Sequence, residues 1–173
     1  METLVEARRT GDQVAQRQLY DLYHERIYRL AVRMVGLQDA ADVLQQVLLQ
    51  VFRTLGQFDG RSRFDTWLYR LSVNESLQHL RRNKRWNYHA LDWEPEAKSA
   101  DSRQREQAEC LEEALRRIAP DLRAIFVLRE IEGLSYDQIA AALSVPQGTV
   151  GSRLNRARRE LQLQLEQLGY KLE

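Results

Sequence analysis

Apolar side chains recur every three or four residues along most of this chain, and this spacing is the feature that most restricts its fold. Between Val14 and Val35 apolar positions follow one another at helical intervals, and the same spacing returns in residues 38–55 and 62–83. No segment shows the strong alternation of a half-buried strand. The 173 residues include only eight Gly and three Pro, few for a turn-rich β protein. We therefore expect an all-α fold.

The first half of the chain is expected to form one compact helical bundle over residues 1–85. Gly36 is a natural end for the first helix, and a second helix is expected over residues 38–55. Ser62 and Asp65 have the spacing of a helix N-terminal cap, which predicts that they open a third helix ending near residue 83.

Four helices are expected in the second half. The first carries its apolar residues up to Ile118, and the next places Pro120 in its first turn and ends before Gly133. Ser135 and Gln138 form a capping-box pattern that predicts a short third helix. A turn then leads into a long last helix over residues 148–168.

Charge divides the chain into three parts. Residues 1–85 carry a net charge of +4, residues 86–115 a net charge of −5 and residues 116–173 a net charge of +2. Two basic blocks around an acidic stretch that is poor in apolar residues predict two lobes with a tether between them. We place a flexible acidic linker at residues 86–104 and the second domain at residues 105–173.

The sequence excludes several classes of protein. One cysteine, Cys110, allows neither an internal disulfide nor a cysteine-based zinc cluster, and the three histidines have no metal-ligand spacing. No apolar run reaches the length of a membrane helix, and no secretory signal is visible. The sequence contains neither a nucleophile triad nor a glycine-rich phosphate loop, so no motif in it indicates an enzyme. We expect a cytoplasmic protein without catalytic residues, metal or cofactor.

The last two helices form a helix-turn-helix pattern, in which a short helix and a tight turn precede a longer basic helix. Projection of the last helix at about 100° per residue gathers its apolar residues in one narrow stripe. The opposite face carries hydroxyl, amide and guanidinium groups, which are the groups that contact bases and phosphates in a major groove. These residues are Ser152, Asn155, Arg156 and Arg159, with Arg153 beside the stripe.

Both halves resemble modules of one known family. Residues 128–161, with Ser-Tyr-Asp-Gln-Ile-Ala before the turn and Gly-Thr-Val-Gly-Ser-Arg after it, resemble the module of bacterial sigma factors that reads the promoter −35 element. The segment Asp39-Ala-Ala-Asp42 and residues 58–74 resemble the module that binds core polymerase and reads the −10 element. With these two modules alone on a short tether, the chain is similar to the extracytoplasmic-function (ECF) sigma factors.

The resemblance implies a site for a flipped base of the −10 element. In the family this base lies between the loop before the third helix, here residues 58–64, and the helix itself, where the base-contacting Asn matches Asn74. An amide both donates and accepts hydrogen bonds, as an extruded base requires. Phe64 and Trp67 are expected in the core. Cations placed to contact phosphates are Arg61, Arg63, Arg81, Arg82, Lys84 and Arg85.

The resemblance also implies a −35 site and a polymerase-binding surface. The −35 contacts fall on Arg129 in the preceding helix and on Ser152, Arg153, Asn155, Arg156 and Arg159 in the last helix, while Gly151 replaces a common Arg or Lys. Asn155 can pair bidentately with adenine. The surface for core polymerase is the polar face of the second helix, with Asp39, Asp42, Gln45 and Gln46.

The expected function is promoter recognition, −10 melting and transcription initiation as an RNA polymerase sigma factor, with core polymerase and promoter DNA as partners. An anti-sigma factor is a further candidate partner, and membrane insertion is not expected. The alternative is a stand-alone helix-turn-helix transcriptional regulator, which predicts a symmetric dimer on a palindromic operator. An adaptor that binds polymerase without reading DNA is disfavoured by the cationic last helix.

Overall fold

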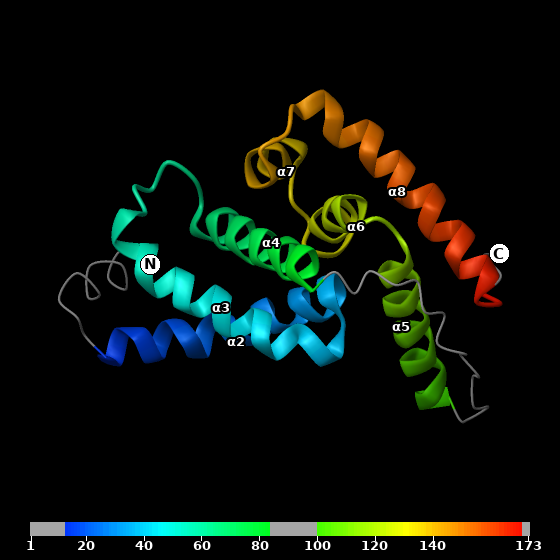
Figure 1. Ribbon diagram of the computed structural model, residues 1–173, viewed down its shortest axis with the longest axis horizontal. Helices are drawn as coiled ribbons and strands as arrows, with labels where there is room; N and C mark the ends of the chain where they lie inside the picture. The colour runs from blue at the N-terminus through cyan, green and yellow to red at the C-terminus, as the bar shows by residue number, and fades with distance from the viewer. Residues whose placement is uncertain (1–12, 84–99, 171–173) are drawn as a thin grey trace.

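The computed structural model describes residues 13–83 and 100–170, and every regular element within these ranges is helical (Figure 1). In chain order the elements are α2 (Gln13–Val35), α3 (Leu37–Thr54), η1 (Leu55–Gln57), α4 (Phe64–Arg82), α5 (Ala100–Arg117), α6 (Pro120–Phe126), η2 (Val127–Ile131), α7 (Tyr136–Leu143) and α8 (Gln147–Gln167). The expected all-α fold is confirmed.

We call residues 13–83 the first lobe and residues 100–170 the second lobe. Much of the predicted linker, residues 86–104, lies outside the described residues, and its last part is helical because α5 begins at Ala100. The domain boundaries therefore stay a prediction.

The first lobe is built from α2, α3 and α4. Gly36 separates the first two helices with a left-handed φ of 88°, which a residue with a Cβ adopts only under strain. Its amide donates to the Val32 carbonyl at 2.8 Å and so closes the last turn of α2. Ile27, Val47 and Leu68, one from each helix, are at most 3% exposed in the shared core. The predicted helix end at Gly36 is confirmed.

The start of α4 differs from the prediction. The helix begins at Phe64, its N-cap residue is Arg63, and no side chain caps it. The prediction that Ser62 caps this helix is wrong, because Ser62 lies one residue before the N-cap position. Asp65 instead reaches across to Arg26 of α2, with 3.5 Å between the carboxylate and the guanidinium.

Aromatic side chains fix the loop before α4 to the helix. The Phe58 ring lies 5.6 Å from the Phe64 ring and 5.4 Å from the Trp67 ring, centroid to centroid. Phe64 is 5% exposed and Trp67 is 8% exposed, so both belong to the core, as expected. Aromatic pairs at these distances add to the free energy of burial. The loop is therefore attached to the helix that carries Asn74.

The second lobe contains the expected helices with one irregularity. Pro120 is the first residue of α6, where its missing N–H costs nothing. The chain stays helical through the π-helical segment η2 and leaves it at Gly133, which has a left-handed φ of 71°. The predicted span from Pro120 to Ile131 is thus confirmed as α6 followed by η2.

The helix-turn-helix is formed by α7 and α8. The Ser135 hydroxyl accepts from the Gln138 amide at 3.2 Å, and the Gln138 side chain accepts from the Ser135 amide at 2.8 Å. This is the predicted capping box. The apolar stripe of α8 is buried against the rest of the lobe, with Val150, Leu154 and Ala157 at 0% exposed. The predicted apolar stripe is confirmed.

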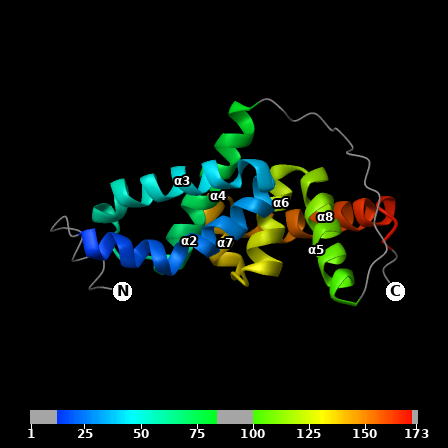
Figure 2. The same cartoon turned by 90° about the horizontal axis from the view of Figure 1, so that it is seen from below.

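The two lobes pack directly on each other, which the charge pattern did not indicate. Leu30, Met34, Tyr69 and Val73 of the first lobe belong to the same apolar cluster as the core of the second lobe. Helices α4 and α7 lie side by side in both views (Figures 1 and 2). Arg123 of α6, only 2% exposed, donates to the Met34 carbonyl of the first lobe.

The capping box yields a test of how α7 is held. Ser135→Ala should lower the free energy of unfolding by about 1 kcal/mol, because the Gln138 backbone N–H loses the hydroxyl that accepts its hydrogen bond. Ser62→Ala, which removes a hydroxyl that caps no helix, should change it by less than about 0.5 kcal/mol. Urea denaturation of the full chain measures both. Equal effects of the two substitutions would contradict the assignment of the cap.

Candidate nucleic-acid interface

The second lobe presents a polar and cationic face on α8. Asn155 and Arg159 are exposed on the side of the helix away from its buried stripe. Within the described residues neither makes a hydrogen bond or an ion pair, so both side chains are available to a ligand. An amide and a guanidinium on one exposed helix face suit contact with base edges and phosphates.

Three other residues predicted on this face have partners. Arg156 pairs with Glu160 at 2.8 Å, Arg153 lies 3.8 Å from Asp121, and the Ser152 hydroxyl donates to a backbone carbonyl one turn earlier at 3.0 Å. The two ion pairs are exposed, and such pairs contribute little to stability. A phosphate can replace either carboxylate without large loss.

Arg129 has a different environment. Its guanidinium donates to the Leu134 carbonyl at 2.8 Å and lies over the Tyr136 ring, 5.4 Å from the centroid. Arg129 therefore holds the loop between η2 and α7. Its assignment as a direct DNA contact stays a prediction.

Gly151 faces the same ring. A Cβ built on Gly151 would lie 3.6 Å from the Tyr136 side chain, an ordinary van der Waals contact. The position is helical, so the glycine is not required by its backbone conformation. Because Gly151 has no side chain, it does not cover the neighbouring Tyr136 ring, which is 37% exposed.

The first lobe places its predicted −10 residues on α4 and the preceding loop. Asn74 is exposed midway along α4. Arg61 pairs with Asp59 at 2.9 Å and Arg63 lies 3.9 Å from Asp65, and both arginines are largely exposed. Arg81 and Arg82 are exposed in the last turn of the helix. Lys84 and Arg85 lie outside the described residues.

The polar face of α3 is a third accessible surface. Asp42, Gln45 and Gln46 are exposed at positions one helical turn apart, while the opposite face is buried in the first lobe. Asp39 differs from them, because its carboxylate lies 3.1 Å from the ring of His79 on α4. The structure thus brings three of the four predicted residues to one open strip and ties the fourth to α4.

The part of the chain that the structure describes contains no group of three or more His, Cys, Asp or Glu side chains that could hold a metal ion. None of its helices combines the length and apolar character needed to cross a bilayer.

These observations define a class. The chain is a two-lobed helical protein whose second lobe ends in a helix-turn-helix with an exposed cationic face, which is a DNA-binding architecture.

Comparison with known proteins makes the class specific. Residues 19–86 match the family Sigma-70 region 2, and residues 108–161 match the family Sigma-70, region 4. The RNA polymerase sigma-H factor of Pseudomonas aeruginosa is 36% identical over 182 residues, which cover 96% of this chain and 94% of that protein. The ECF RNA polymerase sigma factor SigE of Mycolicibacterium smegmatis is 37% identical, and the match spans 88% of this chain and 63% of that relative.

A solved structure has the same fold. The sigma factor RpoE of Bartonella quintana, determined in complex with the anti-sigma factor NepR, superposes with a TM-score of 0.68 over 87% of this chain and 96% of that chain at 24% identity. The two family matches and the identity to curated sigma factors show that the chain belongs to the sigma-70 family of RNA polymerase sigma factors, in its ECF group.

Sequence reasoning missed the residues that join the lobes. Glu132 of the second lobe and Tyr69 of the first lobe are hydrogen-bonded across 63 positions of sequence. Both residues are common types at helical positions, and no spacing in a single sequence pairs them. The only available signal was that Glu132 is an acid directly after an apolar helix and before a glycine.

Gly151 gives a prediction for the interface. Gly151→Ala should raise the free energy of unfolding by about 0.5–1 kcal/mol, because alanine restricts the unfolded chain and its Cβ has room beside Tyr136. Gly133→Ala is the matched control and should lower it by about 1–2 kcal/mol, since its φ is left-handed. Urea denaturation measures both. A loss of stability in Gly151→Ala would show that the Tyr136 ring cannot accept the methyl group.

Proposed function

We propose that this chain is a promoter-specificity subunit that binds bacterial core RNA polymerase and promoter DNA together. Three exposed polar surfaces on different helices support the proposal, namely the strip on α3, the side of α4 with Asn74 and the cationic face of α8. One observation carries the proposal. The chain contains sigma-70 region 2 followed by region 4, and the three surfaces on these regions are exposed.

The strip on α3 is the proposed docking surface for core polymerase. Asp42, Gln45 and Gln46 project from a helix whose other face is fixed in the lobe, so the strip is rigid. The strip carries one carboxylate and two amides, so its binding should depend more on amide hydrogen bonds than on long-range attraction.

The side of α4 that carries Asn74 is the proposed −10 site. Extrusion of a base costs a few kcal/mol, which pairing with an amide and contacts to phosphates must offset. Asn74 provides the amide, and Arg61 and Arg63 in the loop provide exposed cations next to the same helix.

The exposed face of α8 is the proposed −35 site. Asn155 is the residue able to pair bidentately with adenine, and Arg156 and Arg159 are the phosphate contacts. Each lobe alone offers few contacts, so we expect useful affinity only when both act from one polymerase.

The remaining partners and the location follow from this role. We propose that the chain acts by binding and not by catalysis, and that it works in the cytoplasm with polymerase. An anti-sigma factor is a proposed regulatory partner, supported by the fold shared with RpoE of Bartonella quintana in its complex with NepR.

The direct test combines pull-down with core polymerase and run-off transcription from a promoter library. The proposal predicts association with core and initiation that depends on the added chain. A stand-alone regulator would instead bind a palindromic operator as a dimer without core. Failure to associate with core, or no initiation from any template, would contradict the proposal.

Removal of the proposed base contact should affect one step only. Asn74→Ala should lower open-complex formation about 5- to 150-fold, the effect of losing a specific base contact of about 1–3 kcal/mol. Affinity for core polymerase should not change. Permanganate reactivity of the −10 region and a core-binding titration measure the two quantities. Equal losses in both would mean that Asn74 is structural.

Two substitutions on α8 should separate base reading from phosphate binding. Arg156→Ala should weaken binding to all promoter sequences and reduce the slope of log affinity against log salt by about 1. Asn155→Ala should leave that slope unchanged and relax the preference at one base pair by about 1–3 kcal/mol. Binding titrations of the holoenzyme at several salt concentrations measure both. An unchanged slope in Arg156→Ala would show that Arg156 contacts no phosphate.

A further inference from the structure

A carboxylate of the second lobe is inserted into the first lobe. The Glu132 side chain is only 10% exposed and lies between α2 and α4. It accepts a hydrogen bond from the Tyr69 hydroxyl and lies 3.6 Å from Arg26 and 4.0 Å from Arg33. We call Glu132, Tyr69, Arg26 and Arg33 the interlobe cluster.

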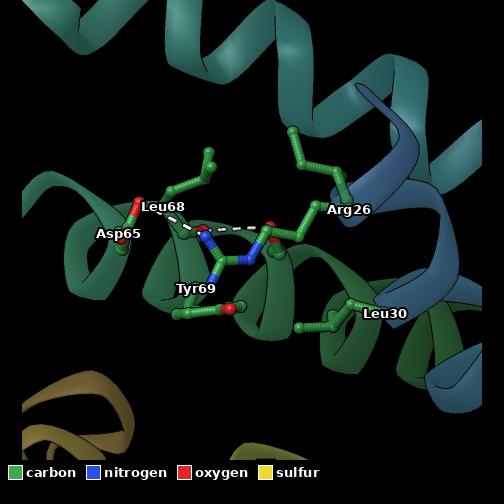
Figure 3. A pocket seen from close by; sticks show the side chains of 7 residues that line it. Arg26, Leu30, Asp65, Leu68 and Tyr69 are labelled. Atoms are coloured by element: carbon green, nitrogen blue, oxygen red, sulfur yellow. Dashed lines mark hydrogen bonds and ion pairs between the residues drawn. The ribbon is translucent and has the colours of Figure 1, made fainter. Parts of the chain in front are cut away.

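The first lobe is shaped to receive this carboxylate. Figure 3 shows Arg26 extended along α4, where its guanidinium lies 4.7 Å from the centre of the Tyr69 ring and 3.5 Å from Asp65. Tyr69 is 4% exposed. Burial, together with the hydrogen bond to Glu132, raises the pKa of Tyr69, so the phenol keeps its proton and donates at neutral pH.

Neighbouring contacts follow the same interface. The Gln138 side chain of α7 lies 3.4 Å from the Thr66 hydroxyl of α4, and Arg123 of α6 donates to the Met34 carbonyl of α2. A largely buried charge is costly unless it is paired and hydrogen-bonded. In the packed arrangement Tyr69, Arg26 and Arg33 of the first lobe together compensate the Glu132 carboxylate, so this contact favours packing only while all of them stay in place.

Packed lobes cannot reach two promoter elements at once. Asn74 lies eight residues from Thr66 along α4, about 12 Å, and Arg159 lies twelve residues from the start of α8, about 18 Å. With about 10 Å for the width of α7, the two proposed reading surfaces are within roughly 40 Å of each other. Elements about 25 base pairs apart are separated by about 85 Å of B-form DNA at 3.4 Å per base pair.

We propose that Glu132 holds the two lobes in a closed arrangement, and that its release from Tyr69, Arg26 and Arg33 is a required step before the chain occupies both promoter elements. The inference rests on the proposed function for its second half only, because the closed arrangement itself can be tested without polymerase. Opening leaves residues 84–99 as the connection, and a segment of that length spans at most about 55 Å.

The chain offers a matched control two residues away. Glu130 pairs with Arg158, and both residues belong to the second lobe. Glu130→Gln therefore removes a charge from the same segment without touching the interface. Glu132→Gln removes the charge that Arg26 and Arg33 compensate, and Tyr69→Phe removes the donor from the other lobe.

Small-angle X-ray scattering of the full chain tests the closed arrangement. Loss of one charge-assisted contact should shift the balance between closed and open forms about tenfold towards open. We expect a larger radius of gyration for Glu132→Gln and for Tyr69→Phe, each with unchanged helical content, and wild-type values for Glu130→Gln. A wild-type radius in both interface variants, or an equal increase in Glu130→Gln, would overturn the proposal. A radius of gyration for the wild-type chain that already matches an extended molecule would also overturn the proposal.

Promoter binding with core polymerase tests the functional half. Glu132→Gln should form promoter complexes several-fold faster than wild type, and Glu130→Gln at the wild-type rate. If Glu132→Gln opens the chain in scattering but does not accelerate promoter binding, opening is not a required step and that half is overturned. Absence of initiation by every variant, wild type included, would count against the proposed function and not against the closed arrangement.

Discussion

Burial of apolar side chains between the two lobes is the constraint on which the rest of the structure depends. Leu30, Met34 and Val73 of the first lobe are at most 1% exposed because the second lobe covers them. Their burial fixes α4 against α7 and brings Glu132 to Tyr69. Separation of the lobes exposes these side chains to water at a cost that grows with the apolar area uncovered. Binding to polymerase and DNA has to offset that cost.

The proposed functional surfaces follow from the same packing. In α3, α4 and α8 one face of the helix is committed to a core, and the opposite face carries the polar groups. The chain can therefore present Asp42, Asn74 and Asn155 from rigid elements on both lobes. A sigma factor that works in this way needs firm surfaces within each lobe and an adjustable relation between lobes. Interlobe contacts that combine an apolar cluster with one largely buried carboxylate, Glu132, meet both needs.

Local features of the fold were predictable from sequence because local rules decide them. Gly36 ends a helix through its backbone freedom, Ser135 and Gln138 cap α7 through a fixed spacing, and the buried stripe of α8 follows the helical period. The error at Ser62 was a shift of one residue at a helix start, where sequence signals are weakest. Periodicity also indicated which residues of α8 are exposed, although not that Arg156 pairs with Glu160.

Contacts between lobes were beyond prediction. Arg123 and Met34 are 89 positions apart, and a helical pattern tells which face is buried without telling what covers it. Opening of the closed sigma factor on its promoter is tested most directly by energy transfer between dyes at positions 70 and 137, where Arg70 of α4 and Asp137 of α7 are exposed. Efficient transfer in the free chain that falls to near zero in the complex with polymerase and promoter is the predicted result. Equal transfer in both states would contradict the account.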